Sequence, residues 1–142
     1  MRMIKGFYIN PCCDEPRSKW FYYGDFEDDL YAFYKLLHCD TIDIITREIY
    51  GIPVAIVCDD NGRLVDNPVP SLFEYYTRAD SSPIEVLCGR ILICGPADDE
   101  GNLTDLPISA YRHIETFACR RDKNGNVVNV CARVYNRPLA GV

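Results

Sequence analysis

The sequence predicts an α+β fold, a single domain with a mostly antiparallel sheet of about five to six strands and two helices. Two observations support this class. Apolar stretches of strand length recur along the chain, whereas helical periodicity is confined to two segments. Strands and helices also show no regular alternation, which argues against a parallel α/β sheet. The chain of 142 residues is long enough for one domain, and no linker or repeat divides it.

Four strands and one helix are predicted in the first half of the chain. Residues 2–10 alternate apolar and polar side chains, and residues 19–23 form a short aromatic strand. Residues 41–50 and 53–58 follow as two strands joined at Gly51. Because the last of these strands is apolar on both faces, we expect it in the centre of the sheet.

The helix is predicted over residues 26–38. Asp25 can cap its N-terminus, and acidic residues follow in the first turn, where the helix dipole favours negative charge. These acidic residues are Glu27, Asp28 and Asp29. Apolar residues recur at helical spacing at Phe26, Leu30, Phe33 and Leu37, so one side of the helix should be buried.

The second half is predicted to contain fewer regular elements. Residues 63–84 are rich in proline and serine and should form an ordered loop with one short helical turn. Residues 86–94 form an apolar strand interrupted at Gly89. A second helix should begin at a Thr104 cap and continue to about residue 118, and residues 127–135 alternate as a final strand.

The charge is unevenly distributed along the chain. The net charge is −6, but residues 120–142 carry +4 and residues 1–119 carry −10. We expect the basic segment to form a hairpin over about residues 119–137. An acidic body argues against direct binding of DNA or RNA, because phosphate affinity comes from Lys and Arg. It favours an acidic face offered to a basic partner, or simply a solvated surface.

Composition and cysteine usage exclude further classes. The longest apolar runs are far shorter than the ~20 residues of a membrane-spanning helix, so no membrane segment is expected. The first residues lack the pattern of a secretory leader, which favours reduced thiols for the eight cysteines. No C-x-x-C spacing is present, so neither a metal nor another cofactor is predicted. Cys58, Cys94 and Cys131 lie in apolar runs and should be buried thiols.

Three acidic segments that contain glycine could suggest cation binding. They are residues 58–62, 98–101 and 122–125, and none has the ligand spacing of a calcium-binding loop. We interpret them as turns in which glycine supplies a positive φ.

No catalytic motif is present, and an enzyme is not indicated. Cys39 follows His38, and the side chains of Ser109 and His113 are four residues apart on the second predicted helix. Cys39 and His113 are the candidate nucleophile and base if the protein is an enzyme. No oxyanion-hole motif, phosphate-binding loop or zinc-binding helix supports such a role.

Ten tyrosines suggest a binding surface. Neighbouring tyrosines on a strand face opposite ways, so one of each pair should be buried. Tyr75 and Tyr76, in the predicted long loop, are the candidates for exposed aromatic residues that stack on a ligand.

Parts of the sequence resemble an uncharacterised family, domain of unknown function 3846. The resemblance covers about residues 25–108 and depends on residues 28–44, 56–62 and 89–104. It implies an origin in bacteriophages and Gram-positive gut bacteria and a location in the host cytoplasm, and it transfers no active site. The Cys12–Cys13 pair and the basic tail after Cys119 fall outside it.

The phage origin implied by the resemblance favours a non-enzymatic counter-defence inhibitor. It could occlude a host immune protein with an acidic face made of Asp25, Glu27, Asp28, Asp29, Asp59 and Asp60. It could instead sequester a nucleotide signal with Tyr75, Tyr76, Arg120, Arg121 and Arg133. The alternative is a phage housekeeping or regulatory domain that contacts a replication or packaging protein, and a small enzyme ranks third.

Overall fold

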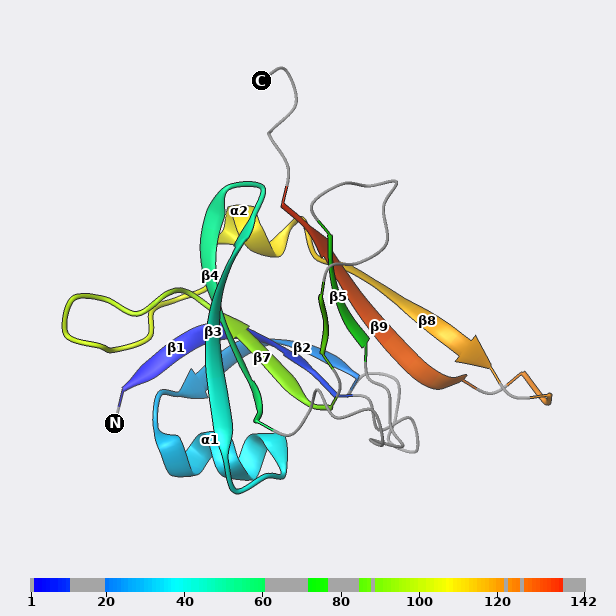
Figure 1. The fold of residues 1–142 in the computed structure, drawn as a ribbon. Helices are drawn as coiled ribbons and strands as arrows, with labels where there is room; N and C mark the ends of the chain where they lie inside the picture. The colour runs from blue at the N-terminus through cyan, green and yellow to red at the C-terminus, as the bar shows by residue number, and fades with distance from the viewer. Residues whose placement is uncertain are drawn as a thin grey trace, which may run out of the picture.

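A computed structural model of the chain describes residues 2–10, 20–60, 72–76, 85–87, 89–121, 123–125 and 127–136. The described residues form two sheets and two helices (Figure 1), which confirms the predicted α+β class. The larger sheet has five antiparallel strands in the spatial order β2-β1-β7-β4-β3. Their bounds are β1 Met3–Ile9, β2 Phe21–Glu27, β3 Ile42–Ile49, β4 Ile52–Asp59 and β7 Ile91–Cys94.

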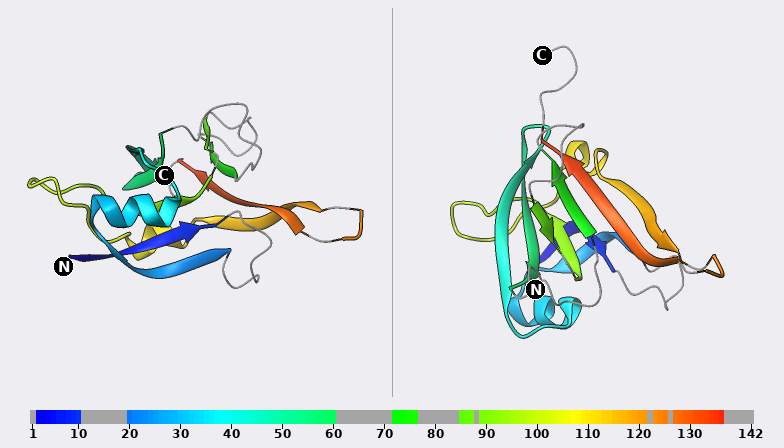
Figure 2. Two further views of the ribbon diagram at one scale, coloured as in Figure 1. Left: turned by 90° about the horizontal axis from the view of Figure 1, so that it is seen from below. Right: turned by 45° about the vertical axis from the view of Figure 1, so that its right-hand side comes forward.

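The smaller sheet has four strands in the order β6-β5-β9-β8. Its strands are β5 Leu72–Tyr76, β6 Glu85–Leu87, β8 Glu115–Arg121 and β9 Val127–Tyr135. All its pairs are antiparallel except β5 with β9, which run parallel. β8 and β9 form an antiparallel pair that extends away from the larger sheet (Figure 2), and the strands include Arg120, Arg121 and Arg133 of the basic segment.

The larger sheet is buried on both faces. Helix α1 (Leu30–Leu37) covers one face, where Phe33 and Leu37 pack with Val57 and Leu92. The other face packs against helix α2 (Ile108–Tyr111) and the smaller sheet. β4 lies between β3 and β7 as predicted, because its apolar side chains are buried on both sides.

Helix α1 begins four residues later than predicted. Asp29, not Asp25, is the N-cap, and its side chain accepts a hydrogen bond from the Ala32 backbone N–H at 3.1 Å. Asp25, Phe26 and Glu27 belong instead to β2, which pairs with β1 through to Met3 opposite Glu27. Seven antiparallel residue pairs outweigh the local periodicity that favoured an earlier helix start.

The second half of the chain differs from the prediction in three places. Residues 72–76 form strand β5, not a loop, because β9 provides a parallel partner. Residues 86–94 do not form one strand: β6 and β7 lie in different sheets, and the chain turns between them at Gly89 with φ 98°. The second helix is a single turn that follows Pro107, and residues 115–121 are a strand.

Thr104 does not cap that helix. It forms an isolated bridge with Gly95, where the Gly95 N–H donates to the Thr104 carbonyl at 2.8 Å. The Thr104 hydroxyl is turned to the Pro96 carbonyl at 2.6 Å. This bridge holds the segment that leads from β7 to α2.

Other predictions are confirmed. Cys58, Cys94 and Cys131 are buried cysteines in the reduced form. Gly101 and Gly125 have positive φ values of 82° and 84°, as turn residues, whereas Asn61 and Gly62 lie outside the described residues. Of the tyrosine pair on β2, Tyr22 is exposed and Tyr23 packs against the core. Neither helix in the described ranges has the length and apolar character needed to cross a bilayer.

The turn between β3 and β4 is attached to the end of β9. Tyr50 and Gly51 both have positive φ, 51° and 80°, as a two-residue hairpin turn of type I′ requires. The Tyr50 N–H donates to the Tyr135 carbonyl at 3.1 Å, and the Gly51 N–H donates to Asn136 Oδ1 at 3.0 Å. The Tyr50 ring also stacks on His113 at 4.1 Å. These contacts join the two sheets at this end.

A candidate binding cleft between the two sheets

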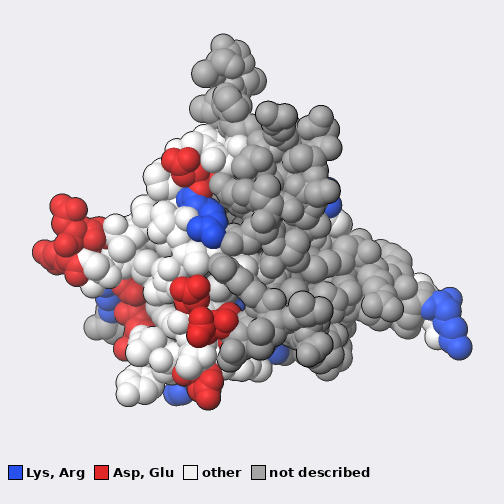
Figure 3. Space-filling view, in the orientation of Figure 1, with Lys and Arg blue, Asp and Glu red and all other residues white. Residues whose placement is uncertain are grey.

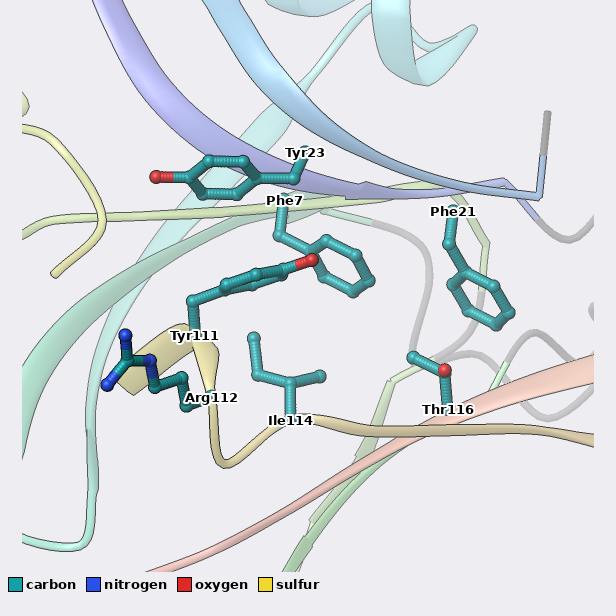
Figure 4. Close-up of a pocket in the computed structure, with 7 residues that line it drawn as sticks. All are labelled: Phe7, Phe21, Tyr23, Tyr111, Arg112, Ile114 and Thr116. Atoms are coloured by element: carbon teal, nitrogen blue, oxygen red, sulfur yellow. The ribbon is translucent and has the colours of Figure 1, made fainter. Parts of the chain in front are cut away.

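A cleft of about 340 Å³ lies between β1 and β2 on one side and the segment from α2 to β8 on the other (Figure 4). Its volume falls within the range of about 300–1,000 Å³ found for small-molecule sites. The described residues that line it are Phe7, Phe21, Tyr23, Tyr111, Arg112, Ile114 and Thr116.

Strand pairing brings the first wall of the cleft together. Phe7 on β1 lies directly opposite Tyr23 on β2, so their side chains share a face, and Phe21 is two residues before Tyr23 on that face. The second wall follows from the short length of α2. The single turn places Tyr111 and Arg112 at its end, and the chain then enters β8 through Ile114 and Thr116.

The aromatic rings form a continuous wall. Phe7 and Phe21 are nearly parallel, with an interplanar angle of 4° and centroids 5.9 Å apart. Tyr111 stacks on Tyr23 at 4.4 Å and meets Phe7 at 5.5 Å with a tilt of 56°. Such a wall favours a flat, apolar ligand surface.

The polar groups of the cleft are separated between its two ends. In Figure 4 the Tyr23 hydroxyl and the Arg112 guanidinium are at one end, and Phe21 and Thr116 are at the other. The Tyr111 hydroxyl points toward the second end, beside the Phe7 ring. Among the described residues that line the cleft, Arg112 has the one charged side chain, and it is exposed.

The predicted acidic face does not form one free surface. Asp25 forms an ion pair with Lys5 at 2.7 Å, and this contact raises the pKa of Lys5. Asp28 is paired with Arg2 at 3.3 Å and also accepts the Leu103 N–H at 3.1 Å. Asp29 is the α1 cap described above.

The remaining acidic residues are dispersed. Glu27 and Asp29 border a shallow groove of about 570 Å³ along α1, which Lys35 also lines. Asp59 and Asp60 are at the end of β4, beyond the C-terminal end of α1. The Asp60 N–H donates there to the Thr41 carbonyl. Figure 3 accordingly shows acidic side chains in separate groups. At least three of the six carboxylates of the predicted face, those of Asp25, Asp28 and Asp29, therefore have structural contacts.

Asp28→Asn is expected to destabilise the protein by about 2 kcal/mol, because it removes the negative charge from a largely buried group that pairs with Arg2 and accepts the Leu103 N–H. Asp60→Asn is the matched control, since its side chain is exposed, and it should change stability by less than about 0.5 kcal/mol. Urea unfolding followed by circular dichroism measures both. Equal stabilities for the two variants would contradict the structural role of Asp28.

The predicted ligand-binding arginines and tyrosines are spread along the smaller sheet by their backbone positions. Tyr75 and Tyr76 are on strand β5, opposite Val134 and Tyr135 of β9. Arg133 pairs with Glu115, five positions along β8 from Arg120, which corresponds to about 17 Å of strand.

Arg121 is one position further still along β8, at the end of the pairing with β9. The Arg133 guanidinium lies over the Phe117 ring, 4.9 Å from its centroid. Arg120 and Arg121 are therefore at one end of the hairpin and Arg133 is at the other.

The candidate catalytic residues are separated by the larger sheet. Cys39 packs on the α1 face, whereas His113 stacks on Tyr50 on the other face. Burial and the nearby Asp59 raise the pKa of Cys39, which is the opposite of thiolate activation. Ser109 is exposed. Within the described ranges, no three or more His, Cys, Asp or Glu residues gather where they could hold a metal ion.

No pattern in the sequence predicts the cleft. Phe7, Phe21 and Tyr111 have the pattern of ordinary apolar residues in strands and a helix, and no motif marks Arg112. The one available signal was Tyr23, since a tyrosine pair on a strand must direct one ring inward. Which residues that ring would meet depends on the β1–β2 register and on the length of α2.

The fold and the cleft define a small α+β protein with two sheets and an aromatic site between them. The chain belongs to the family described as Domain of unknown function (DUF3846), whose model matches residues 12–118. The match begins earlier than the resemblance over residues 25–108 and includes Cys12 and Cys13, while the chain from Cys119 onward stays outside it. No curated protein and no solved structure matches the chain.

Proposed function

We propose that the protein is a non-enzymatic binding protein that sequesters a small planar anion of the nucleotide type in the cleft between the two sheets. The observation that supports this proposal is the cleft lining: an aromatic wall, hydroxyl groups and, among the described residues, a single charged side chain that is positive. Aromatic rings bind planar molecules by stacking, and a guanidinium binds phosphate or carboxylate with paired hydrogen bonds.

The sign of the charge selects the ligand class. The chain as a whole is acidic, with a net charge of −6, yet the described lining contains Arg112 and no carboxylate. An aromatic site for a cationic ligand would have no positive side chain beside the rings, because cation–π contacts do not need one and it would repel the ligand. A planar anion is therefore favoured.

Capture of a small molecule is better supported than occlusion by the acidic face. Occlusion requires a set of free carboxylates on one surface, whereas Asp25, Asp28 and Asp29 are paired, hydrogen-bonded or capping. The α1 groove is shallow and contains both signs of charge, from Glu27, Asp29 and Lys35.

In its biological setting, we propose a phage counter-defence inhibitor that acts in the host cytoplasm by removing a nucleotide signal of the host immune response. The phage origin implied by the family resemblance supports this role. A phage housekeeping or regulatory domain that uses the same cleft is the alternative, and loss of the gene would distinguish them. A counter-defence factor is dispensable on hosts without the defence system, whereas a housekeeping factor is required on every host.

The binding function predicts ligand-dependent thermal stabilisation. A panel of nucleotides and of aromatic carboxylates such as indole-3-acetate, each at millimolar concentration, should include at least one ligand that raises Tm by several degrees. A ligand concentration of 100 times Kd adds about 2.7 kcal/mol to the free energy of unfolding, which corresponds to a rise in Tm of roughly 5–10 °C for a domain of this size.

Tyr111→Leu should abolish that shift while the variant still folds, because leucine keeps apolar volume but not the ring. Tyr31→Leu is the control: it removes a tyrosine that is 72% exposed on α1 and outside the cleft, and it should keep the shift. Absence of any shift across the panel would refute the proposed function.

A further inference from the structure

We infer that the ligand of the cleft is a mononucleotide, with its base against Phe21 and its phosphate at Arg112. This inference rests on the proposed function and specifies the ligand within it. It excludes cyclic dinucleotides and larger nucleotide signals, as well as compact aromatic anions that have no sugar between the ring and the charged group.

The size of the cleft suits one nucleotide unit. Its volume of about 340 Å³ is near the lower end of the range for small-molecule sites, about 300–1,000 Å³. A cyclic dinucleotide has two bases and two phosphates, so it needs two stacking positions and two anion contacts. The described lining provides one anion contact, at Arg112, and so matches one base and one phosphate group.

The base fits the end of the cleft that contains Phe21. Phe7 is buried there and stacks on Phe21, whereas Phe21 is only partly buried, so the uncovered part of the Phe21 ring forms the wall at this end. The Tyr23–Tyr111 pair cannot take the base between its rings, because they are already stacked at 4.4 Å. The base therefore lies beside that pair, on the ring of Phe21.

Hydroxyl groups can recognise the edge of the base at the same end. Thr116 lies across the cleft near Phe21, and the Tyr111 hydroxyl points toward this end (Figure 4). Each hydroxyl can donate and accept, so a ring that carries amide or amino groups satisfies both. A hydrocarbon ring would form neither of these hydrogen bonds, so it should bind more weakly than a base.

The phosphate fits the other end, where Arg112 is placed. The Arg112 side chain is exposed, so a phosphate bound to it stays partly hydrated and its contribution is reduced by salt. The two ends are separated along the cleft by Tyr111 (Figure 4), as the base and phosphate of a nucleotide are separated by its sugar. This order of groups distinguishes a nucleotide from a compact aromatic anion.

Isothermal titration calorimetry with defined probes tests the inference. The probes are AMP, GMP, CMP and UMP, the four matching nucleosides, cyclic di-AMP and cyclic di-GMP, and indole-3-acetate. We expect one mononucleotide to bind most tightly, with the matching nucleoside, both cyclic dinucleotides and indole-3-acetate at least about tenfold weaker. The affinity of the mononucleotide should fall as salt rises.

Two pairs of variants assign the ends of the cleft. Arg112→Ala should weaken the mononucleotide about tenfold and leave the nucleoside unchanged, whereas Lys35→Ala, which removes an exposed cation on α1, should change neither. Thr116→Val should alter the preference among the four bases, whereas Thr46→Val on β3, also exposed, should not.

The outcomes separate the two proposals. Tighter binding of a cyclic dinucleotide, or equal binding of indole-3-acetate, would overturn the mononucleotide inference and leave the proposed function standing. Equal loss of nucleoside and nucleotide binding in Arg112→Ala would overturn the placement of the phosphate. Absence of binding by every probe would overturn both the inference and the proposed function.

Discussion

Gly95→Ala is expected to destabilise the protein by about 3 kcal/mol, a large effect for the addition of one methyl group. A Cβ at this buried position would collide with the Asp105 carbonyl oxygen and the Thr104 hydroxyl, and it would approach the Asp105 carbonyl carbon to 2.9 Å. Two of these groups are backbone atoms that cannot turn aside. They belong to the segment that the Gly95–Thr104 bridge holds in place, so the bridge itself must shift.

Gly24→Ala is the matched control for this change. A Cβ at Gly24 would meet the ring of Tyr22 at 2.6 Å, but that ring is the far end of a half-exposed side chain that can swing away. We expect a loss below about 1 kcal/mol for Gly24→Ala. Chemical unfolding measures both variants, and a Gly95→Ala loss no larger than that of Gly24→Ala would contradict the close approach at the end of β7.

The second large effect is a loss of stability at alkaline pH that depends on Cys94. Burial, together with the nearby Asp28, raises the pKa of this thiol from 9.0 to about 12. Below about pH 9 the thiol is protonated in both the folded and the unfolded state and has no effect. Above about pH 9 the unfolded state loses its proton first. Stability therefore falls as pH rises toward 12, by about 3 kcal/mol at about pH 11.

Cys94→Ala separates this effect from the titration of other groups. Lysines and tyrosines ionise in the same pH range, but they do so equally in both proteins. The unfolding free energy of the wild type minus that of the variant should therefore fall by about 3 kcal/mol between about pH 8 and about pH 11. Parallel curves over this range would show that the pKa of Cys94 is not raised.

Much of the fold could be predicted from local patterns. Four strands lie within one or two residues of their predicted ranges: β1, β3, β4 and β9. Alternating or continuous apolar residues are a strong signal for a strand when the fold buries the corresponding faces. The errors occurred where long-range pairing decided the structure. β2 takes residues that have helical spacing, and β5 lies in a segment rich in proline because β9 is available beside it.

The candidate site was less predictable, for a related reason. The acidic residues of the predicted face, such as Asp28, have partners far away in the sequence, Arg2 and Leu103, which no local pattern reveals. The cleft depends on the meeting of β2 with the end of α2, and on α2 being a single turn. A longer helix, as predicted, would have placed Tyr111 and Arg112 within it and left no short segment to line the cleft.

The order of the strands has a consequence for recombination among related genes. The larger sheet contains β1, β2, β3, β4 and β7. The smaller sheet contains β5 and β6, which precede β7 in the chain, and β8 and β9, which follow α2. Any single crossover between residues 60 and 114 therefore leaves at least one sheet with strands from two parents. Relatives should exchange this domain whole, so the two walls of the cleft, from β1–β2 and from α2–β8, are inherited together.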